Sequence, residues 1–248
     1  MSPGSRRNIL VTLLAMGFGV TAATPVIAQA PRAGDPFSTV DPATAAGDKP
    51  GNWTLHFRYA PPRIITVDVP GKGKVTAWYM VYRIFNTTST PQAVTSLKFD
   101  LVTKDLNTTH LDEPQPAVFK AIAAKEDPEK NMNLLTTVQV TQNPIPVTKP
   151  DSFPRYVSGI AIWTDVDLRA NRTNKFSVYV SGLSDGLVAE KQVDASQLIK
   201  VKTLQLDFQK PTDNIRPGVD DVKREDNGGL GGERWIYRPV DKKPAPKE

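Results

Sequence analysis

Apolar side chains recur at every second position along much of this chain, and this period constrains the fold more than any other feature of the sequence. Trp53, Leu55, Phe57 and Tyr59 alternate with polar residues, which is typical of a β-strand with one buried face. The run from Lys74 to Phe85 is apolar on both faces, so it predicts a central strand that is covered on both sides.

The same reading extends to about eight or nine short strands separated by turn residues. Strands are expected over 53–59, 63–69, 74–85, 94–103, 134–141, 156–163, 175–181 and 198–208, with a last apolar piece at 235–237. Helical segments do not alternate with these strands, which disfavours a parallel α/β fold. The pattern predicts a mostly β chain, an antiparallel immunoglobulin-like β-sandwich with one short helix.

That helix is expected from Pro116 to Lys125. A proline fits the first turn of a helix, and Asp127 and Pro128 end the apolar pattern. We expect the helix to cap an end or an edge of the sheets.

The first 28 residues are predicted to be a signal peptide. Arg6 and Arg7 precede an apolar run shorter than the ~20 residues that a membrane span needs, and small residues near Ala28 fit a signal peptidase. We place the cleavage after Ala28, because cleavage after Ala30 would leave Pro31 at the new terminus. The secretory and twin-arginine routes both stay open, and an uncleaved membrane anchor is the alternative.

The rest of the chain is expected to form one domain with less ordered ends. Residues 29–50 lack apolar periodicity and predict a flexible leader, 51–239 a β-sandwich domain, and 240–248 a disordered tail. Prolines concentrate at 142–155, and we interpret this stretch as a long connection inside one sandwich, with an internal domain boundary as the alternative.

Composition excludes several functional classes. The chain has no cysteine, which removes thiol catalysis, thiolate metal sites and a lipoprotein anchor. Without residues 1–28, whose only charged side chains are Arg6 and Arg7, the net charge falls by two, from +5 to +3. The basic residues are scattered among acids, so no nucleic-acid partner is expected. Phosphate loops, zinc-protease pairs and serine-hydrolase elbows do not occur in the sequence.

A few side chains are candidates for chemistry. Asp165 and Asp167 follow a strand and could face one hard cation or serve a glycoside hydrolase, although a solvated turn fits them better. His56 and His110 suit proton transfer near neutrality, but we expect both on the surface, His110 in a loop. Further candidates, interpreted as solvated loops or turns, are Asp220, Asp221, Glu225 and Asp226 and the segment 182–186.

The four tryptophans have two interpretations. Together with nearby tyrosines they could form a stacking platform for sugars, or they could fill the space between two sheets. We favour core packing because most of them lie in strand-like runs; the residues are Trp53, Trp78, Trp163 and Trp235.

Four segments carry a resemblance to known sequences, namely 78–88 (WYMVYRIFNTT), 162–167 (IWTDVD), 180–184 (VSGLS) and 235–238 (WIYR). With this set the chain resembles uncharacterised exported proteins of planctomycete-type bacteria. The resemblance covers most of 53–238 and implies an extracytoplasmic location and an immunoglobulin-like fold. A strand that ends in Asn-x-Thr is also similar to extracytoplasmic immunoglobulin-like domains, in which the asparagine helps to close a turn. The resemblance implies no activity and no site residue.

The sequence therefore predicts an exported non-enzymatic protein, periplasmic or secreted, that binds a protein or envelope component. No catalytic, cofactor-binding or metal residue is predicted, and no stable membrane span after signal cleavage. The alternatives are an extracytoplasmic carboxylate-dependent hydrolase acting on polysaccharide and a carbohydrate-binding module.

Overall fold

The chain divides into two compact units, Met1–Ala30 and Pro31–Glu248. The computed structural model describes residues 36–149, 152–166, 174–192, 197–210, 222–225 and 232–240, all of which belong to the second unit. The predicted signal peptide at 1–28 and residues 241–248 of the predicted tail lie outside the described residues.

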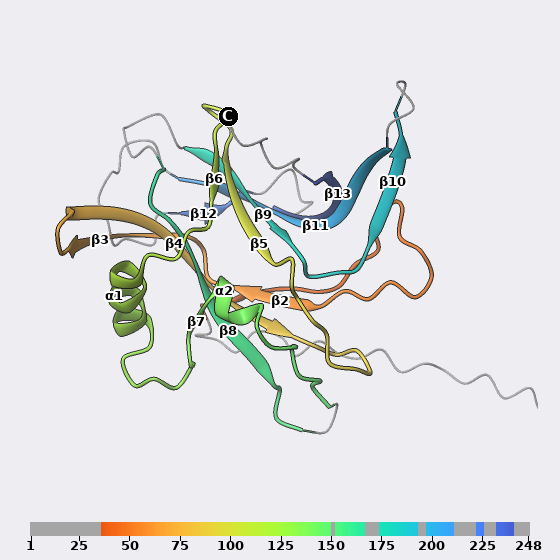
Figure 1. Cartoon of the computed structure of the whole chain (residues 1–248), viewed down its shortest axis with the longest axis horizontal. Coiled ribbons are helices and arrows are strands. Elements are labelled where there is room, and N and C mark those ends of the chain that lie inside the picture. Colours follow the sequence, from red (N-terminus) through yellow and green to blue (C-terminus); the bar gives the residue numbers. More distant parts are fainter. Residues whose placement is uncertain are drawn as a thin grey trace, which may run out of the picture. The chain divides into compact units, whose positions relative to one another are not determined.

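The first sheet is built around the long strand β4, which β2 and β3 share as a partner (Figure 1). The strand order is β1-β2-β4-β8-β7, and β3 pairs with the first half of β4. All pairs are antiparallel except the short β7–β8 pair. The strands are β1 (Ser38–Val40), β2 (His56–Tyr59), β3 (Arg63–Val69), β4 (Gly73–Phe85), β7 (Leu135–Thr136) and β8 (Tyr156–Trp163).

The second sheet is built in the same way around the long strand β11. Its order is β10-β11-β9-β5-β6, with β12 and β13 also paired to β11, and every pair is antiparallel. The strands are β5 (Lys98–Thr103), β6 (Thr109–Leu111), β9 (Lys175–Ser181), β10 (Leu187–Lys191), β11 (Gln197–Gln209), β12 (Lys223–Arg224) and β13 (Glu233–Pro239).

An aromatic core joins the two sheets into a β-sandwich. Tyr82 of β4 meets Phe99 of β5 with ring centroids 4.5 Å apart, and Trp78 meets Phe176 edge to face at 5.2 Å. All four rings are buried. Burial of each large ring contributes about 1.5–3 kcal/mol, and the contact geometry adds to that. The prediction of a mostly β chain with two packed, largely antiparallel sheets is confirmed.

Helix α1 (Pro116–Glu126) has nearly the predicted bounds, but not the predicted place. It packs its buried residues Val118 and Ile122 on the outer face of the first sheet, against a second apolar cluster that includes Tyr79 and Ile162. The helix therefore covers a sheet face, whereas the sequence suggested the end or edge of a sheet. The cause is visible in β4, since a strand that is apolar on both faces requires cover on both.

The prediction of a strand over 134–141 is wrong for most of that range. Only Leu135–Thr136 form a strand, and helix α2 (Thr137–Val140) follows directly. Thr136 and Gln139 form a reciprocal capping box, in which each side chain accepts a hydrogen bond from the backbone of the other. This local pairing competes with a strand and starts a helix at Thr137, so the chain has two described helices instead of one.

The expected bounds of β3, β8 and β9 are those observed, whereas other strands differ. The strand at 53–59 begins only at His56, and that at 94–103 only at Lys98. Strands β1, β6, β10 and β12 were not predicted.

The expected flexible leader does not hold for residues 36–50. Phe37 and Val40 are buried, and β1 adds a strand beside β2. In the proline-rich stretch, Ile145 is fully buried in the main core, which contains residues from both sides of 142–155.

Candidate functional site

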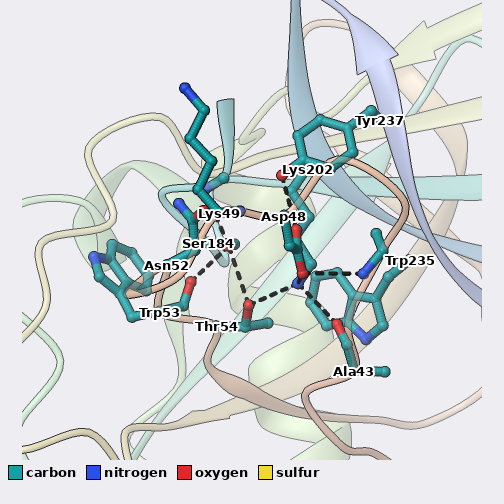
Figure 2. Close-up of polar contacts among 12 residues, drawn as sticks. Ala43, Asp48, Lys49, Asn52, Trp53, Thr54, Ser184, Lys202, Trp235 and Tyr237 are labelled. Atoms are coloured by element: carbon teal, nitrogen blue, oxygen red, sulfur yellow. Dashed lines mark hydrogen bonds and ion pairs between the residues drawn. The ribbon is translucent and has the colours of Figure 1, made fainter. Parts of the chain in front are cut away.

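A buried lysine lies on β11 where this strand passes the segment 41–54. Alternation along the strand places Lys202 on the same face as Leu204 and Leu206, which belong to the core, and its side chain is only 2% exposed. Figure 2 shows the polar contacts around Lys202. A lysine on an inward-facing position needs partners for all three of its protons.

Lys202 has those partners. Its Nζ donates to Asp48 Oδ2 at 2.6 Å, to the Ala43 carbonyl at 2.8 Å and to Thr54 Oγ1 at 3.1 Å. It also lies 5.4 Å from the centroid of the Trp235 ring. The three hydrogen bonds from Nζ are therefore all made within the protein.

Asp48 is held from three sides. Burial alone would raise its pKa, but hydrogen bonds from Lys202, from the Ala45 amide and from the Tyr237 hydroxyl outweigh burial and lower the pKa. The burial and the nearby carboxylate raise the pKa of Tyr237 to about 12. Both shifts favour an ionised Asp48 that accepts a hydrogen bond from a protonated Tyr237.

An open hollow of about 550 Å³ adjoins Lys202 and is lined by Trp53, His56, Thr88 and Asn52, among others. Much of its polar lining is already used within the protein. Asn52 donates to Asp185 and accepts from the Lys49 amide, and Thr88 bonds to Asn86. We interpret this place as a clasp that fastens residues 41–54 to the second sheet.

The second candidate is a cleft of about 290 Å³ at the side of the sandwich, between β6 and α2. The lining of the cleft includes Phe99 of β5 and Leu97, which lies just before β5. It also includes Asp112 and Thr137. Leu111 and Val138 also line it, and they are 57% and 54% exposed. Large apolar side chains that are half exposed beside a cleft are a common feature of binding sites.

Asp112 closes the sandwich on this side. Its amide donates to Phe99 O of β5 at 3.1 Å, while its carboxylate accepts from the Ile162 amide of β8 at 2.8 Å and from Thr137 Oγ1. Burial raises the pKa of Asp112 to about 6, against the opposing effect of these two hydrogen bonds. A carboxyl group at a cleft that titrates near neutrality is a marker of functional sites, although structural carboxyl groups can behave in the same way.

His110 differs from its expected place. It is 7% exposed in strand β6, not on a surface loop, and its Nδ1 lies 3.0 Å from Asp165 Oδ2. Its Nε2 is 2.9 Å from Thr108 Oγ1. The proximity of His110 and Asp165 could not be inferred from the sequence, because 55 positions separate the two residues. The Asp165 side chain is 63% exposed, and neither residue lines the Asp112 cleft or the hollow beside Lys202.

The other sequence candidates are distributed as follows. His56 is half-buried at the start of β2, with Nδ1 3.2 Å from Asp41 Oδ1. Glu225 pairs with Lys104 and Lys175, whose hydrogen bonds lower its pKa despite burial. In the segment 182–186, Ser184 forms an isolated antiparallel bridge with Thr54 and its hydroxyl donates to the Trp53 carbonyl. Asp167, Asp220, Asp221 and Asp226 lie outside the described residues.

The tryptophans do not form an exposed platform. Trp78 and Trp163 are 1% and 0% exposed, and Trp53 and Trp235 are partly buried and pack against the same core. Core packing is therefore confirmed for Trp78 and Trp163, while Trp53 and Trp235 pack on the core with part of each side chain exposed.

Sequence reasoning missed both Lys202 and Asp112. For Lys202 a signal existed, because this lysine falls on the apolar register of its strand. For Asp112 there was none, since its environment is created by Thr137 and Ile162, which are distant in sequence.

Among the described residues, no group of three or more histidine, aspartate or glutamate side chains could hold a metal ion. No helix within the described ranges is long and apolar enough to span a bilayer. Comparisons with protein-family models, with curated proteins and with solved structures found no match.

Proposed function

We propose that this chain is an exported, non-enzymatic β-sandwich that binds a protein component of the cell envelope through the cleft between β6 and α2. The predicted signal peptide at 1–28 supports an extracytoplasmic location. The immunoglobulin-like character of the sandwich belongs to the same proposal, supported by two antiparallel layers that pack across an aromatic core.

The observation that carries the proposal is the pairing of Leu111 and Val138 at the cleft. Both are large, apolar and more than half exposed, and they flank a cavity of about 290 Å³. Interface energy concentrates in a few apolar or aromatic anchors that fill such pockets. One large side chain of a protein partner fits this cavity, and the apolar rim excludes water around it.

A binding role fits the cleft better than a catalytic one. The two oxygens of Asp112 are engaged by Ile162 N and Thr137 Oγ1, so the carboxylate holds the fold together. Catalysis by this group would need a substrate to break at least one of these bonds. Binding of an apolar anchor leaves both bonds intact.

Capture from envelope extracts with substituted chains tests the proposal. Leu111→Asp places a charge on the rim of the cleft, and Leu187→Asp makes the same change on β10, where Leu187 is 47% exposed. We expect the wild-type chain and Leu187→Asp to retain the same polypeptide and Leu111→Asp to lose it. Equal capture by all three, or specific capture by none, contradicts the proposal.

Location is tested separately. The full chain and a chain that lacks residues 1–28 are expressed in a bacterial host, and both are followed by fractionation. We expect only the full chain outside the cytoplasm, shortened at its amino terminus. Retention of the full chain in the cytoplasm overturns the export part of the proposal and leaves the cleft experiment unaffected.

A further inference from the structure

Arg83 has an unusual environment on the outer face of the first sheet, beyond the area that α1 covers. Thr39, Arg58, Arg83 and Ser158 lie side by side in register across β1, β2, β4 and β8. The row therefore brings two guanidinium groups and two hydroxyl groups to one face of the sheet.

Aromatic rings fix the Arg83 guanidinium. Its Cζ lies 4.0 Å from the centroid of the Phe37 ring and 5.0 Å from that of Tyr156. Arg58 is placed similarly, 4.9 Å from the Phe85 ring. For Arg83, stacking on ring faces leaves the edges of the guanidinium, which carry its N–H groups, available for hydrogen bonds in the plane of the group.

Two polar atoms of this row, one on Arg83 and one on Ser158, have no partner of their own. Arg83 Nε and Ser158 Oγ are buried and make no hydrogen bond. Among the described residues, Arg83 makes one hydrogen bond, from Nη2 to the Met132 sulfur, a weak acceptor, at 3.3 Å, and it pairs with no carboxylate. A buried polar group without a partner costs about 1–3 kcal/mol, so its presence in a native fold calls for an explanation.

We propose that Arg83 is the centre of a recognition site for a carboxylate group, offered by an acidic side chain of a protein partner. A planar carboxylate matches the fork of a single guanidinium in a bidentate pair. The surroundings favour a polypeptide as its source, because Tyr156 is 39% exposed and Phe153, nearby in sequence, is 95% exposed. This site is independent of the Asp112 cleft and does not rest on it.

Titration of the full chain with sodium acetate, followed by the NMR amide signals of Tyr156 and Ser158, tests the site. The variants are Arg83→Lys, which keeps the charge but loses the fork, and Lys74→Gln, which removes an exposed charge from the same strand. We expect saturable shifts in the wild type and in Lys74→Gln, and about tenfold weaker binding in Arg83→Lys.

Three outcomes overturn the proposal: shifts that do not saturate, shifts that are equal in Arg83→Lys, and tighter saturation by inorganic phosphate than by acetate. The last would assign the site to phosphate groups. Wild-type data alone already decide whether the shifts centre on residues 156–158 or spread over all basic positions, so the test holds even where Arg83→Lys changes the fold. Shifts that spread over all basic positions contradict the carboxylate site. A negative result in the capture experiment at the Asp112 cleft does not affect the carboxylate site.

Discussion

Gly159 lies directly opposite Tyr82 across the β4–β8 pair, and the Tyr82 ring occupies the space that any side chain at position 159 would need. A Cβ atom at Gly159 would lie 2.3 Å from Cζ and 2.4 Å from the hydroxyl oxygen of Tyr82. Tyr82 is fully buried and also contacts Phe99 in the opposite sheet. The missing side chain of one strand thus allows an aromatic contact between the two sheets.

Gly159→Ala is expected to destabilise the fold by about 2 kcal/mol or more, because the buried Tyr82 ring cannot move without disturbing Phe99. Urea unfolding measures the change. The same substitution in a Tyr82→Leu background should cost clearly less, since the clash is then relieved. Equal costs in the two backgrounds would show that Tyr82 is not the obstacle.

Lys202→Met should lower the free energy of unfolding by about 3 kcal/mol or more, because Asp48 would keep a charge in a largely buried place without its partner. Lys200→Met is the control on the same strand. Its partner Glu190 is 53% exposed, so we expect a loss below about 1 kcal/mol. Adding Asp48→Asn to Lys202→Met should recover part of the lost stability. Denaturant unfolding of the wild type, the two lysine variants and the double variant checks this. Equal losses in Lys202→Met and Lys200→Met would refute the clasp.

The raised pKa of Asp112 should make the free energy of unfolding depend on pH. Its pKa is raised by burial to about 6 from an ordinary value of 3.8. A raised folded-state pKa means that its contribution to stability is complete below pH 3.8 and is lost as the pH rises through about 6. Between pH 4 and 7 the wild type should therefore lose on the order of 2 kcal/mol relative to Asp112→Asn, which can keep both hydrogen bonds. Parallel unfolding free energies of the two chains across this range would contradict the raised pKa.

Asn86 closes the turn after β4 with four hydrogen bonds. Its Nδ2 donates to the Thr90 and Ile145 carbonyls, and its Oδ1 accepts from the amide and hydroxyl of Thr88. Asn86→Asp removes both donors and places a carboxylate against two carbonyl oxygens, so we expect a loss of about 2–4 kcal/mol at neutral pH. Asn107→Asp, in an exposed turn, should have little effect. Comparison of the two melting temperatures checks the prediction, and equal values would mean that the turn does not need its amide.

The parts of the fold that the sequence predicted are those set by burial. β3, β8 and β9 have the bounds that alternation gave them, because one-residue shifts would turn their apolar side chains outward. The side chain of Asn86 closes the turn after β4 by bonding to Thr88 and Thr90. Helix α1 was predictable from Pro116 and the residues after it.

The sequence-based predictions fail where contacts other than the alternation of apolar residues determine the structure. Thr136 and Gln139 turned an apparent strand into α2, and the Thr-x-x-Gln spacing was a readable signal for this. β1 is held by pairing with β2 and by Phe37, which a sequence rich in Pro, Ala and Gly does not reveal. The Asp112 cleft could not be predicted, because it forms where β5, β6 and α2 converge.

Asp48 bonds to Lys202 of β11 and to Tyr237 of β13, and Trp235 Nε1 donates to the Asp41 carbonyl. These three contacts tie residues 41–48 to β11 and to β13, the last described strand. Shortening the chain before Glu233 would remove two of these three anchors at once, so a protease should then cut within residues 41–54. Early and late parts of the domain should likewise exchange their amide hydrogens at similar rates, opening and closing as one cooperative unit.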